Sequence, residues 1–323
     1  MEKYVLFTIG DRPVTLFALC IVIAVSAGLW MMRWEQKKQG LHADTTEIFA
    51  LLALPLGLLG GRFIYCLCNF RLFIYELGLS RMLRLWDGGY AMLGIALGAA
   101  LAAWITGKIT SQSALRVLDM IAAPCAIIIA LCRFAEGASG QGFGREVENP
   151  FFQRFPFAVY NTDWEIWFWA IFMLEGVAAF VVALVLQSKR IPSKPGSKIK
   201  MFLILICAGQ TLFEMMREDG YLRLEPWFIR ITQLAALLVL LGLMISAMIV
   251  WKRLPNEQRI AGWKMGLYWM IFLACVGVDV WMQFAIQKSA DLPVWACFSV
   301  MSACSAGFGA VAYRMVFRQT LSQ

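Results

Sequence analysis

Long apolar runs separated by short polar loops form the dominant pattern of this chain. Each run covers about 20 residues, the length of helix needed to cross the hydrocarbon core of a bilayer. They predict nine transmembrane helices, over 13–32, 48–68, 90–106, 117–132, 164–187, 200–216, 229–251, 263–287 and 293–317. The first run has no basic n-region of the usual kind and is too long for a signal core, so we expect it to stay as an anchor. The predicted fold class is therefore an all-α polytopic membrane protein.

One polar segment falls where lipid is otherwise expected. Residues 133–146 hold two arginines, two glutamates, one glutamine and four glycines. Ionisable groups at membrane depth cost several kcal/mol unless they face a protein interior or a watery cavity, so this cluster indicates a functional site. The planar fork of an arginine also matches the oxygens of a phosphate.

The glycines of this segment fit two structures. Gly137, Gly140 and Gly144 either open a polar re-entrant turn near 133–146 or let helices pack closely through small residues. We favour the re-entrant turn, because Ser139 and Gln141 interrupt any apolar helix face.

Composition agrees with the membrane interpretation. Hydrophobic residues make up 60% of the chain, charged residues make up 15%, and the mean hydropathy is +0.68. A soluble protein of this length would need far more polar surface to cover its core.

The basic residues of the loops predict the orientation, because short cytoplasmic loops are enriched in Lys and Arg. Basic residues follow the first, third, fifth and seventh spans: Arg33, Lys37, Lys38, Lys108, Arg116, Lys189, Arg190, Lys194, Lys198, Lys200, Lys252, Arg253, Arg259 and Lys264. These loops share one side if nine spans alternate, so the N-terminus is predicted outside, the C-terminus inside and segment 133–146 outward. The net charge of +8 reflects this bias and affinity for anionic headgroups, and we expect no nucleic-acid partner.

Several kinds of chemistry are excluded by residue type. The nine cysteines lie almost all in apolar runs without C-x-x-C spacing, and His42 is the only histidine. The sequence therefore predicts no metal site and no Ser-His-Asp chemistry. It also contains no nucleotide-binding loop, and we expect no cofactor.

A series of short motifs carries a family resemblance. They are, in order, Phe7-Thr8-Ile9-Gly10, Gln39-Gly40-Leu41, Pro55, Gly60-Gly61-Arg62-Phe63, Trp86-Asp87-Gly88-Gly89-Tyr90, the segment 133–145, the group Glu214, Arg217, Glu218 and Asp219, and Ile231-Thr232-Gln233. In this order they resemble bacterial prolipoprotein diacylglyceryl transferases. The resemblance covers roughly 1–250, a seven-helix membrane domain, and leaves 251–323 as two additional transmembrane helices.

The resemblance implies a reaction and its partners. That family moves the diacylglyceryl group of phosphatidylglycerol to the cysteine thiol of a prolipoprotein peptide, and it releases glycerol phosphate at the outer leaflet of the bacterial plasma membrane. Phosphatidylglycerol or another anionic phospholipid, a prolipoprotein peptide and the membrane are thus the implied partners.

The resemblance and the residue chemistry together suggest the site. By resemblance, Arg133 holds the lipid phosphate and Gly144-Arg145 closes the pocket. Glu136 follows Arg133 by three residues and is the candidate base for the thiol, unless the two side chains simply neutralise each other. The expected catalytic residues are Arg133, Glu136 and Glu214, and the expected substrate-binding residues are Gly88, Gly89, Tyr90, Gly140, Gln141, Gly144, Arg145, Arg217 and Gln233.

Departures from the family pattern keep the function open. Leu93 stands at a family histidine, Glu136 at an asparagine, Gln141 at a glutamate and Gln210 at an arginine. One hypothesis is a divergent transferase, which we favour. The alternative is an inactive relative that binds phospholipid or lipidated peptide.

A secondary transporter is a weaker third hypothesis. Asp119, Glu175 and Asp279 are single carboxylates in apolar spans and fit proton-linked transport, but helix–helix contacts are the favoured interpretation. Transporters of this kind also carry paired broken helices in two corresponding halves, and only one such segment is present.

Cysteine-accessibility labelling checks the predicted orientation. In a cysteine-free background, the Ser139→Cys variant should react with a membrane-impermeant maleimide in intact cells. The Ser193→Cys variant should react only after the cells are opened, because its loop carries the basic residues of the cytoplasmic side. Labelling of Ser193→Cys in intact cells would reverse the assignment.

Overall fold

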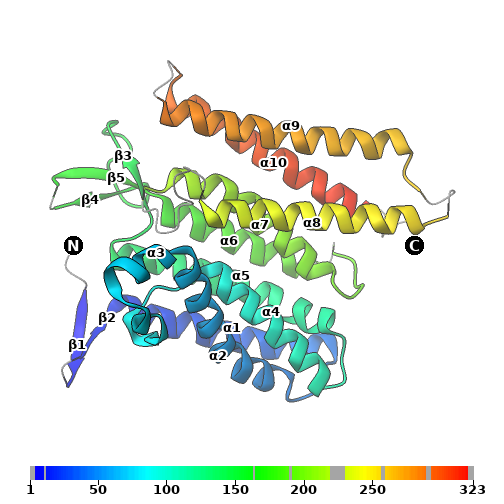
Figure 1. The fold of residues 1–323 in the computed structure, drawn as a ribbon, viewed down its shortest axis with the longest axis horizontal. Helices are drawn as coiled ribbons and strands as arrows, with labels where there is room; N and C mark the ends of the chain where they lie inside the picture. The colour runs from blue at the N-terminus through cyan, green and yellow to red at the C-terminus, as the bar shows by residue number, and fades with distance from the viewer. Residues whose placement is uncertain are drawn as a thin grey trace.

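Nine long helices run side by side in a computed structural model that describes residues 4–10, 12–162, 164–188, 191–218, 230–255, 259–288 and 292–318 (Figure 1). Within these residues the long helices are α1 (Leu16–Gln39), α2 (Thr45–Cys68), α4 (Met92–Ile109), α5 (Ala114–Ser139), α6 (Ile171–Gln187), α7 (Ser197–Met216), α8 (Ile231–Arg253), α9 (Gly262–Gln287) and α10 (Val294–Arg318). Each predicted span falls on one of them.

The lengths and surfaces of the helices suit a bilayer. Eight are at least 18 residues long and apolar enough to cross a membrane, and α6 is apolar but has 17 residues. Large apolar side chains point outward, among them Leu51 at 77% and Leu54 at 68% exposure. Water would disfavour such a surface, whereas lipid accepts it. The predicted all-α polytopic membrane fold is confirmed.

Short strands gather at the end of the bundle where the N-terminus lies (Figure 1). β1 (Val5–Ile9) pairs antiparallel with β2 (Arg12–Thr15). β3 (Phe143–Glu146), β5 (Ile166–Ala170) and β4 (Ala158–Asn161) form a second antiparallel sheet in that order. The fifth span therefore begins later than predicted, because the aromatic run of β5 pairs as a strand before α6 starts. Its Trp167 ring contacts Tyr160 of β4 at 5.4 Å between centroids.

The expected re-entrant turn over 133–146 is not confirmed. Residues 133–139 continue α5, which ends at Gly140 with a left-handed φ of 73°. The backbone N–H groups of Gly140 and Gln141 both donate to the Glu136 carbonyl, and this closes the last turn. After Gly142 the chain enters β3, so the polar segment consists of a helix end followed by a strand.

Helices α2 and α4 cross with their backbones in contact. A Cβ on Gly94 would stand 2.1 Å from the Gly60 carbonyl oxygen, and one on Gly98 would stand 2.3 Å from the Leu56 carbonyl oxygen. Only glycine permits this approach, which is the usual role of small residues between membrane helices. The crossing fixes the loop that precedes α4 against the end of α2.

Helix α5 lies at the centre of the bundle and also caps a neighbour. It packs against α1, α4, α6 and α7. Its buried Asp119 accepts hydrogen bonds from the backbone N–H groups of Gly196, at 2.6 Å, and Ile199, at 2.9 Å, where α7 begins. A carboxylate at a helix N-terminus satisfies unpaired donors and opposes the helix dipole. For Asp119 the favoured helix-contact interpretation agrees with the structure.

Helices α9 and α10 form a hairpin that packs on α7 and α8 through α10. The Ser305 hydroxyl of α10 donates to the Ala208 carbonyl of α7 at 2.5 Å. Phe308 and Met315 of α10 lie fully buried in the same core as Leu240 of α8. The hairpin therefore supports the back of α7, the helix that carries Glu214.

Replacing the capping carboxylate should destabilise the bundle. We expect Asp119→Ala to lower the free energy of unfolding by about 1–2 kcal/mol, because two buried N–H groups of α7 lose their acceptor. Asp44→Ala is the matched control, since Asp44 stands at the start of α2 and its side chain makes no capping hydrogen bond. Chemical denaturation in detergent measures both variants, and an equal loss in the two would contradict the capping role.

Candidate functional site

Four charged side chains, two of them buried and two half-buried, form a closed ring where α5, α6 and α7 meet. The charge ring consists of Arg133 and Glu136 of α5, Glu175 of α6 and Arg217, which directly follows α7. Arg133 Nη1 lies 2.5 Å from Glu136 Oε1, and Arg133 Nε lies 2.9 Å from Glu175 Oε2. Arg217 Nη1 lies 3.0 Å from Glu136 Oε2 and 2.9 Å from Glu175 Oε2. Each guanidinium therefore contacts both carboxylates.

The charge ring is neutral and shielded from its surroundings. Its side chains are 13% exposed at Arg133, 14% at Glu136, 4% at Glu175 and 9% at Arg217. Two cations and two anions in a low-dielectric site compensate each other, whereas loss of one would leave an unpaired buried charge. The hypothesis that Arg133 and Glu136 neutralise each other thus agrees with this structure, and Glu175 takes part equally.

Glu214 belongs to a second, adjoining group rather than to the charge ring. Glu214 Oε2 accepts from Gln210 Nε2 at 2.6 Å, and Glu214 Oε1 lies 3.6 Å from Arg230 Nη1. Arg230 Nη2 also donates to the Arg217 carbonyl at 2.5 Å. Position 210 holds the neutral amide of Gln210, and the cation near Glu214 is instead Arg230, the residue before α8. Sequence reasoning missed Arg230, which lies outside every motif.

The glycine-rich stretch lies directly over the charge ring. Gly142 has a φ of +77°, and a Cβ there would stand 2.8 Å from Glu136 Oε2. Gly144 pairs with Arg217 in an antiparallel bridge, and the Glu218 N–H donates to the Phe143 carbonyl at 2.9 Å. Small residues let β3 approach both the carboxylate and the end of α7.

Arg145 follows this stretch but has a different partner from Arg133. Arg145 Nε lies 3.2 Å from Glu218 Oε1, with the two side chains 39% and 53% exposed. Arg133 thus contacts the carboxylates of the charge ring, whereas Arg145 pairs with Glu218 at the rim. Arg217 is the second guanidinium that the structure places beside Arg133.

Gly88, Gly89 and Tyr90 lie in the loop before α4, where they are held by Arg62. Arg62 Nη1 donates to the Gly88 carbonyl and Nη2 to the Arg81 carbonyl at 2.6 Å. The Tyr90 hydroxyl donates to the Leu85 carbonyl. These predicted binding residues thus form a loop that is organised by a buried arginine of α2.

Gln141 and Gln233 have mainly structural contacts. The Gln141 backbone N–H closes α5, as described above. Gln233 of α8 is buried and its Nε2 donates to the Thr211 carbonyl of α7 at 3.3 Å. Gln233 thus joins two helices beside Glu214.

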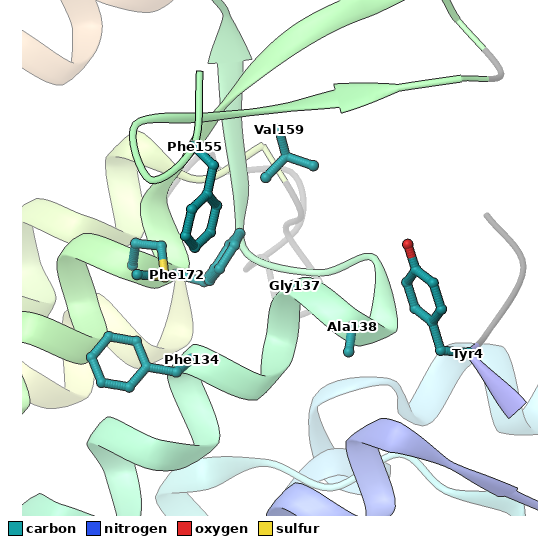
Figure 2. A pocket seen from close by; sticks show the side chains of 8 residues that line it. Tyr4, Phe134, Gly137, Ala138, Phe155, Val159 and Phe172 are labelled. Atoms are coloured by element: carbon teal, nitrogen blue, oxygen red, sulfur yellow. The ribbon is translucent and has the colours of Figure 1, made fainter. Parts of the chain in front are cut away.

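An apolar cavity of about 470 Å³ opens beside the last turns of α5. Phe134, Gly137 and Ala138 come from α5 and Phe172 from α6. Phe155, Val159, Met173 and Tyr4 complete the lining. Figure 2 shows Phe155 and Phe172 on one side of the space and Tyr4 on the other. The cavity shares the end of α5 with the charge ring, so an apolar chain and an anionic group can bind side by side.

The site can bind an anion that takes the place of a carboxylate beside the two guanidinium groups. The guanidinium groups of Arg133 and Arg217 bind carboxylate oxygens, and phosphate oxygens have the same preferred geometry with guanidinium. Among the described residues, no group of three or more His, Cys, Asp or Glu side chains is arranged to hold a metal ion. The side chains of the charge ring offer electrostatic stabilisation by guanidinium groups and proton transfer by carboxylates.

Comparison with known proteins gives a consistent family match. Residues 4–251 match the model of the prolipoprotein diacylglyceryl transferase family. A phosphatidylglycerol–prolipoprotein diacylglyceryl transferase of Bacillus licheniformis is 24% identical over 257 residues, which cover 78% of this chain and 93% of the relative. One of Symbiobacterium thermophilum is 26% identical over 260 residues, which cover 77% and 93%. The resemblance drawn from the motifs is confirmed.

Breaking the charge ring should destabilise the protein more than breaking the rim pair. We expect Glu175→Gln to lower the free energy of unfolding by about 3 kcal/mol, because Arg133 and Arg217 both lose a buried anionic partner. The matched control is Glu218→Gln, which removes the exposed partner of Arg145 and should change stability by less than about 1 kcal/mol. Denaturation in detergent compares the two variants, and equal effects would show that the ring is not a buried electrostatic unit.

Proposed function

The chain belongs to the prolipoprotein diacylglyceryl transferase family, and from this membership we propose that it transfers the diacylglyceryl group of phosphatidylglycerol to a prolipoprotein cysteine. The two relatives named above carry this activity in their names, and this chain covers 93% of each. The multi-pass fold agrees with the bacterial plasma membrane as its location. The observation that carries the proposal is the charge ring with an apolar cavity beside it.

The donor phosphate binds Arg133 and Arg217 by displacing a carboxylate. Phosphate and carboxylate oxygens compete for the same guanidinium donors, and the phosphodiester of phosphatidylglycerol carries one negative charge, as a carboxylate does, so one anion exchanges for another. As the bond between the glyceryl carbon and the phosphate oxygen breaks, negative charge grows on the departing glycerol phosphate. Two fixed guanidinium groups in a shielded site stabilise that charge.

The displaced carboxylate provides the base. Glu136 suits this role better than Glu175, because its side chain is 14% exposed against 4% for Glu175. Glu136 takes the proton of the acceptor thiol, and the thiolate sulfur attacks the glyceryl carbon. A thioether forms, the carbon–oxygen bond breaks, and glycerol phosphate leaves with the bonding electrons. The proton then passes from Glu136 to water.

Glu214 and Arg230 hold Arg217 in place. The bond from Arg230 to the Arg217 carbonyl and the contact of Arg230 with Glu214 hold the end of α7 against the start of α8. Arg217 then has one orientation toward the ring, as a clamp requires. Gln233 supports the same helix pair from α8.

The surrounding residues bind the apolar and polar parts of the substrates. A volume of about 470 Å³ fits part of an acyl chain or the apolar residues that flank an acceptor cysteine. Gly140, Gln141 and Gly144 shape the strand over the ring, and Arg145 on the rim attracts the headgroup. Gly88, Gly89 and Tyr90 shape the loop before α4.

A transfer assay tests the reaction and the base together. The purified protein is given phosphatidylglycerol labelled in its diacylglyceryl group and a peptide with the acceptor cysteine, and labelled thioether is measured. We expect transfer by the wild type and a fall of about 10²–10⁴-fold in Glu136→Gln, because the isostere keeps the shape but cannot accept the proton. The matched control is Glu148→Gln, an exposed glutamate outside the ring, which should keep the wild-type rate.

Other outcomes separate the parts of the proposal. No transfer by the wild type from any anionic phospholipid, together with retained lipid, would replace the enzyme by a lipid-binding relative. Transfer by Glu136→Gln at the wild-type rate would remove Glu136 as the base and leave the activation of the thiol to the field of the two arginines.

A further inference from the structure

Glu175 contacts the two arginines of the charge ring in a different way from Glu136. One oxygen of Glu175, Oε2, lies 2.9 Å from both Arg133 Nε and Arg217 Nη1. Glu136 instead gives one oxygen to each guanidinium, Oε1 to Arg133 and Oε2 to Arg217. Glu175 Oε1 is buried and has no hydrogen-bond donor within the residues that the structure describes. Glu175 is therefore a bridge between the two cations, and among these residues they alone balance its charge.

The start of α6 is fixed against α5 on both sides of Glu175. A Cβ on Gly176 would stand 2.4 Å from the Phe134 ring, so the two helices are in close contact just after Glu175. Phe172, three residues before it, packs on Gly137, where a Cβ would stand 2.7 Å from the Phe172 ring (Figure 2). An interior packed this closely does not deform freely, and the Glu175 side chain is only 4% exposed. Its carboxylate therefore stays between the guanidinium groups when an anion enters the ring.

An anion that stays in place fixes the charge of the phosphate clamp. The two guanidinium cations and the Glu175 anion leave a net charge of one positive unit. This charge matches the phosphodiester of a phospholipid donor, which carries one negative charge. Glycerol phosphate, the product of transfer, is a monoester whose second pKa of about 6 gives it nearly two negative charges at neutral pH. The product therefore carries a charge that the clamp does not neutralise.

We propose that Glu175 promotes product release: as a permanent anion in the clamp, it favours the singly charged phosphodiester and disfavours the doubly charged monoester. The inference rests on the proposed function, since the two phosphates are the donor and the product of that reaction. Glu175 contacts the arginines and not the reacting atoms, so it is a positioning residue. It weakens the stabilisation of the departing phosphate, and the same repulsion empties the clamp for the next donor.

Binding of two soluble phosphates to the purified full-length protein tests this preference without any transfer reaction. Glycerophosphoglycerol is the phosphodiester probe and glycerol phosphate is the monoester probe. Calorimetry measures the Kd of each at about pH 8, well above the second pKa of the monoester. We expect the wild type to bind the diester at least as tightly as the monoester, although the monoester has the larger charge. A wild type that prefers the monoester by about tenfold or more would overturn the role of Glu175.

Replacing Glu175 with Gln should shift the preference toward the monoester. Coulomb energy scales with the charge of the ligand, so removal of one nearby anion should tighten the diester about tenfold and the monoester about a hundredfold. The ratio of the two Kd values then changes about tenfold, which a merely structural role would not produce. Equal changes for both probes would contradict the proposal.

Two further variants separate charge from geometry and from surface effects. Glu175→Asp keeps the charge and should keep the wild-type preference, and a shift equal to that of Glu175→Gln would overturn charge as the cause. The matched control Glu218→Gln removes an exposed carboxylate at the rim and should leave the ratio unchanged. An equal shift in that control would assign the preference to general surface charge. If Glu175→Gln does not fold, the wild-type preference still decides the proposal.

The binding data and the transfer assay can fail separately. A wild type that prefers the diester but never transfers diacylglyceryl would disprove the proposed reaction and support the role of Glu175. A working transferase that prefers the monoester would keep the reaction and overturn this role. Binding of neither probe to the wild type or to Glu175→Gln would overturn the clamp and the role of Glu175 with it.

Discussion

The ring of Arg133, Glu136, Glu175 and Arg217 is the constraint on which the strand-bearing end of the bundle depends. Four charges buried between helices are tolerated only when each has its partners within hydrogen-bond distance, because isolated charges cost many kcal/mol in a low-dielectric interior. The ring therefore fixes the ends of α5, α6 and α7 relative to one another. Gly142 follows from it, since a Cβ there would stand 2.8 Å from Glu136 Oε2, and Gly144 lets β3 lie against the Met216 carbonyl at the end of α7.

The same arrangement couples binding to chemistry. A ring whose cations are already occupied binds a phosphate only by releasing a carboxylate, and a released carboxylate is able to accept a proton. An uncharged headgroup gains too little from the guanidinium groups to displace Glu136. Selection of an anionic donor and activation of the acceptor would thus be one event rather than two.

The sequence predicted the helices well and the site in part, for physical reasons. Nine apolar runs predict nine helices because their length alone is diagnostic. The sequence pattern places the aromatic run at 166–170 in a helix, because a short apolar run has no periodicity that distinguishes a strand from a helix. The pairing of Arg133 with Glu136 follows from a spacing of three residues on a helix. The sequence predicts a helix contact for Glu175 without naming its partners and gives no signal for Arg230, because these partners come close only when α5 to α8 pack together.

The hairpin of α9 and α10 changes the surroundings of α7, the helix that carries Glu214. With α10 bonded to α7 through Ser305 and buried against α8, one face of that pair meets protein instead of lipid (Figure 1). Helix tilt in a bilayer responds to hydrophobic mismatch unless neighbouring helices set it. A bilayer that thickens or thins must therefore tilt four helices together. The depth of Glu214 and Arg217 in the membrane is consequently buffered against changes in lipid chain length.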